Sequence, residues 1–136
     1  MKTTAKITGI LNGLTGLTQI VIGAMLWAGK ARSLTSFHMT VGVLFVLSLW
    51  TLALIAGRFH VGKGLGALAV LWGIVVLLFG IAQPQIMPGS GHWVIRVVHL
   101  LLGLAAMAQA GVLARRIRAS ASPHPTSAAP ELGPVR

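Results

Sequence analysis

Two histidines, His38 and His99, stand inside long stretches of the chain that carry almost no charge. An ionisable side chain in so apolar a stretch is costly, which makes it a candidate for function. Neutral imidazoles are good ligands for transition metals, and two of them on facing helices bind a haem iron from both sides. We therefore interpret His38 and His99 as candidate metal ligands, namely the axial ligands of one haem b.

Neighbouring residues add to this interpretation. Each histidine is followed four residues later by a glycine, Gly42 or Gly103, in the pattern H-x-x-x-G. On a helix this glycine lies on the same face one turn away, and its missing side chain leaves room for a flat ring. These two glycines are therefore included in the candidate cofactor site.

Arg96 is the other candidate cofactor-binding residue. His92, Arg96 and His99 have the spacing i, i+4 and i+7, which places them in one stripe on a helix. Arg96 lies one turn from His99, where it would pair with a haem propionate. Lys30 and Arg32, in the preceding connection on the same side, are alternative partners for that group.

A plainer interpretation remains open for each of these residues. Histidines are common where lipid headgroups meet a helix, and His99 would also suit a hydrogen bond between helices. Arg96 would extend toward headgroups without any ligand. H-x-x-x-G also suits a face on which two helices pack closely. Quinone, lipid and copper are further candidate ligands.

Composition excludes most enzyme classes. The chain has no Cys and no Tyr, and its one acidic residue is Glu131. Thiol chemistry, a Ser-His-Asp triad, paired carboxylates and a carboxylate cage for Ca²⁺ or Mg²⁺ are therefore impossible. We assign no catalytic residue and do not expect an enzyme. The net charge of +10 is distributed between apolar runs, which favours a membrane protein over a nucleic-acid-binding one.

Four apolar segments must position these residues. They are residues 7–28, 37–57, 64–82 and 92–114. About 20 residues of helix span a hydrocarbon core ~30 Å thick, and helix is the conformation that satisfies the backbone in lipid. We predict an all-α, transmembrane four-helix up-down-up-down bundle over residues 1–118, with a disordered cytoplasmic tail over residues 119–136. The first segment is too long for a signal peptide, and we expect it to be retained.

The positive charges predict the orientation. On one side of the membrane are two lysines before the first segment, Arg58 and Lys63 in the second connection, and Arg115, Arg116 and Arg118 after the last segment. The other side has Lys30 and Arg32. Basic residues concentrate on the cytoplasmic side, so we expect both termini there, in the inner (plasma) membrane. Trp27 and Trp93 then lie at the outer interface, where indole rings are enriched.

An internal repeat is a further hypothesis. Gly16 and Gly23 are seven residues apart in the first segment, and Gly73 and Gly80 are seven apart in the third. The H-x-x-x-G pattern recurs in the second and fourth. The chain would then be two pseudo-repeated helical hairpins. Because glycine is frequent in membrane helices, chance matches are the alternative explanation.

The segment from Phe37-His38-Met39 to Leu54, with His92-Trp93-Val94-Ile95 and Val98-His99-Leu100-Leu101, resembles small uncharacterised bacterial four-helix membrane proteins. That resemblance implies no activity. The pair of histidines is also similar in a general way to membrane b-type cytochromes, although this chain has one such pair and lacks their multi-haem spacing.

Two functional hypotheses follow. The first is a haem held by His38 and His99, for electron transfer or for sensing a redox carrier such as quinone. The second is a non-catalytic scaffold or accessory subunit that packs against another membrane protein. One geometric objection faces the first hypothesis. If Arg58 and Arg115 lie at equal depth, their different distances in sequence from the histidines place the two imidazoles ~6 Å apart in height.

Overall fold

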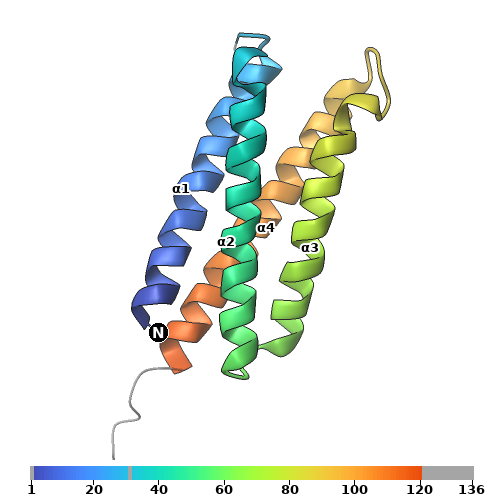
Figure 1. Ribbon diagram of the computed structural model, residues 1–136. Helices are drawn as coiled ribbons and strands as arrows, with labels where there is room; N and C mark the ends of the chain where they lie inside the picture. Colours follow the sequence, from blue (N-terminus) through green and yellow to red (C-terminus); the bar gives the residue numbers. More distant parts are fainter. Residues whose placement is uncertain (1, 31, 121–136) are drawn as a thin grey trace, which may run out of the picture.

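The computed structural model describes residues 2–30 and 32–120, and over these it is a bundle of four helices (Figure 1). The helices are α1 (Lys2–Trp27), α2 (Thr35–Arg58), α3 (Lys63–Ala82) and α4 (His92–Ser120). Short 3₁₀ turns, η1 (Arg32–Leu34) and η2 (Gln83–Gln85), precede α2 and follow α3. The predicted up-down-up-down bundle is confirmed. Apart from residues 119 and 120, which belong to α4, the predicted tail lies outside the described residues.

The helices are longer than the apolar segments that predicted them. α1 begins at Lys2 and α4 continues to Ser120, beyond the predicted limits of 7 and 114. Hydropathy marks where a chain leaves the hydrocarbon, whereas a helix ends where its backbone is capped. Gly29, with φ of +70°, caps α1, and the amide of Lys30 then donates to the carbonyl of Met25. This bond pattern is a Schellman motif.

All four helices are long and apolar enough to cross a membrane. Large apolar side chains cover their outer surfaces, among them Leu14, Leu54, Leu78 and Leu101, each more than half exposed. A water-soluble protein rarely exposes so much contiguous apolar surface, whereas hydrocarbon accommodates it. The structure therefore agrees with a multi-pass membrane protein.

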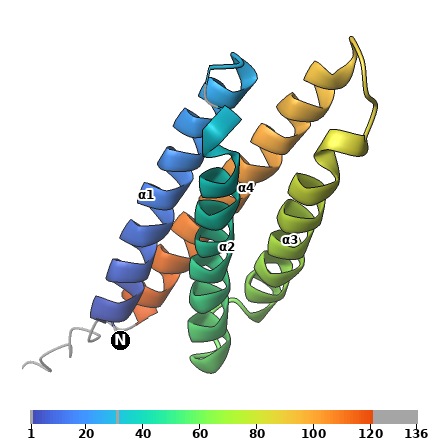
Figure 2. The same cartoon turned by 45° about the horizontal axis from the view of Figure 1, so that its top comes forward.

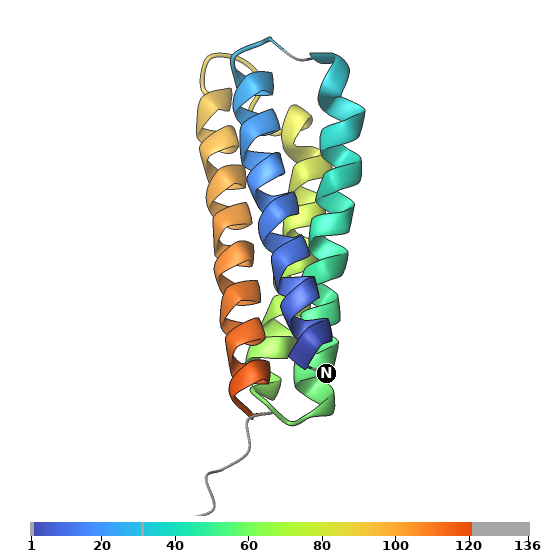
Figure 3. The ribbon, with the colours of Figure 1, turned by 90° about the vertical axis from the view of Figure 1, so that its left-hand side faces the viewer.

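The N-terminus and the end of α4 lie at the same end of the bundle, called here the terminal end (Figure 3). The α1–α2 and α3–α4 connections form the opposite end, called the loop end. α2 contacts α4 along the centre, and in the described structure α1 and α3 make no contact with each other. Toward the loop end the α1–α2 hairpin diverges from the α3–α4 hairpin (Figures 1 and 2).

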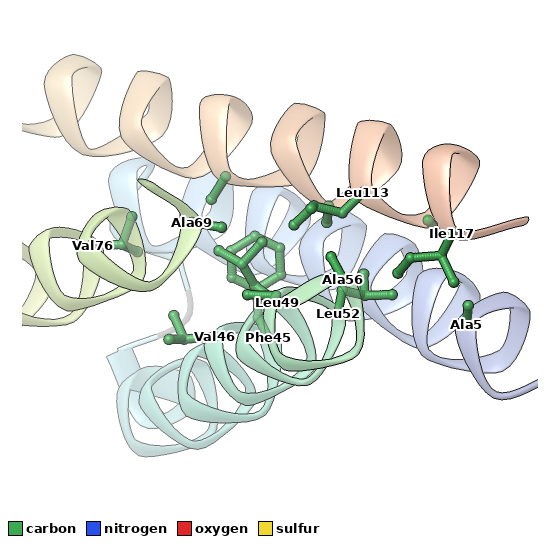
Figure 4. Close-up of a cluster of buried hydrophobic side chains, with 14 residues drawn as sticks. Ala5, Phe45, Val46, Leu49, Leu52, Ala56, Ala69, Val76, Leu113 and Ile117 are labelled. Carbon is green, nitrogen blue, oxygen red and sulfur yellow. The ribbon is translucent and has the colours of Figure 1, made fainter. Parts of the chain in front are cut away.

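The tightest packing lies nearer the terminal end. Leu49 and Leu52 of α2 and Leu113 of α4 are fully buried in one cluster (Figure 4). Five buried residues of α2 correspond to five of α4 that stand 61 positions later. The first set is Phe45, Leu49, Leu52, Ala53 and Ala56, and the second is Ala106, Ala110, Leu113, Ala114 and Ile117. The central helices α2 and α4 therefore share one pattern of buried positions.

Glycine contacts repeat in the same way. A Cβ atom added at Gly9 would lie 3.2 Å from Ala114, and one at Gly66 would lie 3.2 Å from Ala53. Gly16 likewise packs on Met107. In the repeat, Gly73 of α3 is equivalent to Gly16 of α1 (57 positions apart), and Val46 of α2 is equivalent to Met107 of α4 (61 positions apart). Gly73 packs on Val46, just as Gly16 packs on Met107. Chance matches in composition would not reproduce these contacts, so the two hairpins are structural repeats of each other.

Candidate functional site

The divergence of the two hairpins encloses a cavity of about 560 Å³ at the loop end, and residues of all four helices line it. His38 and His99 both line this cavity, together with Arg96 and His92. The stripe predicted on α4 therefore faces the interior of the bundle.

Helix register, extended from the contacts of the packed end, gives the two histidines similar heights in the bundle. Gly9 and Gly16 of α1 stand opposite Ala114 and Met107 of the antiparallel α4. Seven residues further toward the loop end, the register places Gly23 opposite Leu100. Gly23 also contacts His38 of its own hairpin, where an added Cβ atom would lie 3.5 Å from the imidazole Cε1. His38 is thus within about one residue, or ~1.5 Å, of the height of His99.

The second hairpin gives the same result. Gly66 and Gly73 of α3 stand opposite Ala53 and Val46 of α2. Continuing this register by seven residues toward the loop end places Gly80 opposite Met39. An added Cβ atom at Gly80 would lie 3.1 Å from Cε1 of His99. The height difference expected from sequence holds only if Arg58 and Arg115 lie at equal depth. The repeat does not support that condition, because it pairs Arg58 with Ala119, near the end of α4.

Most of the cavity wall consists of pairs of residues that are equivalent in the two hairpins. The pairs from α1 and α3 are Gln19 and Val76, Ile20 and Leu77, Gly23 and Gly80, Ala24 and Ile81. The pairs from α2 and α4 are Thr35 and Arg96, His38 and His99, Met39 and Leu100, Gly42 and Gly103, Val43 and Leu104. Two similar walls thus face each other, each carrying one imidazole.

The two predicted glycines line the cavity but differ in surroundings. The side chain of Gln19 occupies the space beside Gly42, and its Nε2 donates to the carbonyl of His38 at 2.7 Å. Gly42 therefore makes room for an amide and not for a flat ring. Nothing lies within 4 Å of a Cβ atom added at Gly103, so space remains on that side.

Arg96 is half-buried in the cavity wall, and Arg32 from η1 lines the same cavity. Lys30, the other predicted partner of an anion, does not line it. The described residues contain no carboxylate side chain, because Glu131 lies outside them. The cavity thus has two guanidinium groups near its loop end and no anionic side chain among the described residues to neutralise them.

Neither imidazole makes a hydrogen bond with any described residue, and Nδ1 is buried in both. The ring of His99 stacks on Phe79 with centroids 6.0 Å apart and planes 9° apart. A buried polar atom without a partner costs about 1–3 kcal/mol, so two of them in one cavity indicate that another molecule supplies the partner.

The ligand set restricts which metal would fit. No group of three or more His, Cys, Asp or Glu side chains that could hold a metal comes together in the part of the chain that the structure describes. Two imidazoles alone do not complete a tetrahedral or octahedral site. They do suit a metal whose remaining ligands come from a macrocycle, as in haem.

Sequence reasoning missed the partners that orient the histidines. Gly23 and Gly80 were noted for their spacing alone, and their contacts with the imidazoles depend on hairpin geometry. Gln19 bonds to the carbonyl of His38 across the α1–α2 interface, a contact that spacing along one helix does not indicate. Comparison of the chain with protein-family models, with curated proteins and with solved structures gave no match in any of the three.

Proposed function

We propose that the cavity binds one b-type haem, with His38 and His99 as its axial ligands. The observation that carries the proposal is the pair of imidazoles without protein partners, on equivalent positions of facing walls and at similar heights. Two ligands placed in this way suit a flat group that lies between two similar surfaces. The bound group would supply one-electron redox chemistry, which the side chains themselves lack.

The size and lining of the cavity support this ligand. Its volume of about 560 Å³ lies within the range of sites for organic cofactors, and most of its lining is apolar. The open space beside Gly103 gives a macrocycle room next to His99. Gln19 holds the carbonyl of His38, which fixes the first turn of α2 beside the imidazole.

The two arginines that line the cavity would set the orientation of the bound haem. Arg96 would hold one carboxylate of the group, and Arg32 the other, since guanidinium groups form strong bonds with carboxylates. Both line the cavity near the loop end, so the carboxylates would point toward that end. A neutral ligand such as quinone would leave the half-buried Arg96 without a counter-anion, which favours haem.

The charge distribution supports an inner-membrane protein with both termini in the cytoplasm. The haem would then lie in the outer half of the bilayer. Met39 and Val43 of α2 and Leu104 of α4 line the cavity, are apolar and are more than two-fifths exposed. A quinol in the hydrocarbon would approach the haem closely at these residues, so quinol is the electron donor that we propose.

Absorption spectra of the protein purified from cells supplied with a haem precursor test the proposal. We expect a Soret band from the unchanged chain, and its loss in His38→Ala and in His99→Ala. His60→Ala is the control, because His60 lies in the α2–α3 connection at the other end of the bundle. A colourless unchanged protein would contradict haem binding and leave the accessory subunit as the better explanation. Quinol-dependent reduction of the band tests the donor.

A further inference from the structure

A second cavity, of about 520 Å³, lies between α1 and α4 at the terminal end of the bundle. Three basic residues line it, Lys6 of α1 and Arg115 and Arg118 of α4. Its remaining lining is small or apolar, and Ile10 is half exposed there. Gly111, Arg115 and Arg118 have the spacing i, i+4 and i+7, so the two arginines border one strip of α4.

The structural repeat provides an internal comparison. The equivalent place between α3 and α2 retains a lysine, Lys63, in the position of Lys6. The positions of Arg115 and Arg118 hold Leu54 and Gly57 there, and the position of Gly111 holds Trp50. One hairpin interface thus has an open groove with three basic side chains, and its repeat has neither arginine.

Trp50 covers the next part of the other interface toward the loop end. Its indole N–H donates to the carbonyl of Val70 on α3 at 3.1 Å, and its ring lies against Gly73, two positions that correspond to Gly13 and Gly16 of α1. Gly111, at the position of Trp50, has no side chain and lines the α1–α4 groove. The two repeats share their packing core but differ here, which indicates that the groove serves something other than packing.

We propose that this groove binds an anionic phospholipid, with its phosphate among Lys6, Arg115 and Arg118 and its acyl chain along Gly9 and Ile10. Basic pockets between helices on the cytoplasmic side of a membrane recognise such headgroups. The groove joins a cationic rim to an apolar strip that faces hydrocarbon. A free phosphate would use the rim alone, whereas a lipid uses both. This site does not depend on haem.

Titration of the purified protein in neutral detergent with phosphatidylglycerol tests the proposal, with intrinsic tryptophan fluorescence or native mass spectrometry as the readout. Phosphatidylcholine and inorganic phosphate are the comparison ligands. We expect saturable binding of phosphatidylglycerol and at least tenfold weaker binding of the other two. The double variant Lys6→Gln/Arg115→Gln should bind phosphatidylglycerol roughly 30-fold more weakly, from about a fivefold factor per basic residue.

The matched control is Arg58→Gln/Arg116→Gln, which removes the same charge at the same end of the bundle. Arg116 extends toward Gly62 in the α2–α3 connection and does not line the groove. Equal losses in the two double variants would overturn the proposal, because they would indicate attraction to total charge. Equal binding of inorganic phosphate would show an anion site without lipid specificity and would also overturn it.

A second variant fills the groove without changing its charge. Gly111→Trp introduces the residue that the other repeat has at this position, and a Cβ atom there meets nothing closer than 3.8 Å. We expect it to weaken phosphatidylglycerol binding at least tenfold while the melting temperature is maintained. Unchanged binding in this variant would contradict a lipid chain in the groove. Circular dichroism of each variant verifies that the bundle is folded.

Discussion

Glycines on the outer helices control the positions of the two imidazoles. Gly23 and Gly80 are equivalent in the repeat, but their distances to the histidines differ. A Cβ atom at Gly23 would make ordinary contact with His38 at 3.5 Å, whereas one at Gly80 would approach His99 to 3.1 Å. Because His99 also stacks on Phe79, its ring has little freedom to move away.

This difference predicts unequal effects of one substitution. Gly80→Ala should displace the His99 ring and weaken haem binding at least tenfold, whereas Gly23→Ala should change it less than threefold. Haem titration of the apoprotein, followed at the Soret band, gives both values. Equal affinities in the two variants would show that the glycines do not position the imidazoles.

For single residues, the sequence indicated several side chains that line the cavity but not the side chains of neighbouring helices that contact them. His38, His99 and Arg96 were predicted as one site from charge, chemistry and helical spacing, and all three line one cavity. The role predicted for Gly42 was incomplete, because the side chain that fills the space beside it comes from α1. A spacing rule describes one helix, and it contains no information on which side chain of a neighbouring helix enters the gap.

At the scale of the helices, the backbone cap that ends α2 contains a strained residue, His60. At the end of α2, His60 has φ of +56°, and the amides of His60 and Val61 donate to the carbonyls of Gly57 and Ala56. This is the left-handed cap position that glycine normally occupies, and a side chain there costs about 1 kcal/mol.

Replacing this residue by glycine should therefore stabilise the protein. We expect His60→Gly to raise the free energy of unfolding by about 0.5–1 kcal/mol, measured by thermal or denaturant unfolding in detergent. The substitution His60→Ala, which keeps a Cβ atom, should leave stability nearly unchanged. A loss of stability in the glycine variant would mean that the imidazole makes a contact that offsets the strain.

One polar residue of α1 joins α1 to α2 in the core. Asn12 is 2% exposed, and its amide donates to the hydroxyl of Ser48 at 2.8 Å and to the carbonyl of Phe45 at 3.1 Å. Thr18, in contrast, donates to Leu14 of its own helix. Among the described residues, the side-chain hydrogen bonds from α1 to another helix come from Asn12 and Gln19.

Asn12→Ala should accordingly lower the free energy of unfolding by about 1–2 kcal/mol, since two hydrogen bonds between helices and a buried side chain are lost. Thr18→Ala should change it by less than about 0.5 kcal/mol. Both values follow from unfolding in detergent. Equal small effects would indicate that Asn12 is bound to water or detergent in the unfolded state as well as it is bound in the bundle.

Over the whole molecule, two structurally repeated hairpins pack tightly at one end and diverge at the other. Hydropathy and length were sufficient to predict the four helices and their alternating directions, because lipid allows few other arrangements. The repeat was a hypothesis from glycine spacing, and the packing of Gly9, Gly16, Gly66 and Gly73 gives it a structural basis. The cavity could not be predicted, because it results from the angle between hairpins, which depends on all their contacts together.

Orientation in the membrane is a prediction for the whole chain. The protein has no cysteine, so single cysteines can be introduced without background. Ser33→Cys and Ser90→Cys, at the loop end, should react with a membrane-impermeant maleimide in intact cells. Ser120→Cys, at the terminal end, should react after the membrane is opened. The reverse pattern would place the haem near the cytoplasm and contradict the charge argument.

Electron paramagnetic resonance of the oxidised, haem-loaded protein tests most directly whether two histidines hold one iron across the cavity. We expect a low-spin ferric signal at one haem per chain, converted to a high-spin signal or lost in each of His38→Ala and His99→Ala. A high-spin signal from the unchanged protein, or a low-spin signal that survives either substitution, would contradict it.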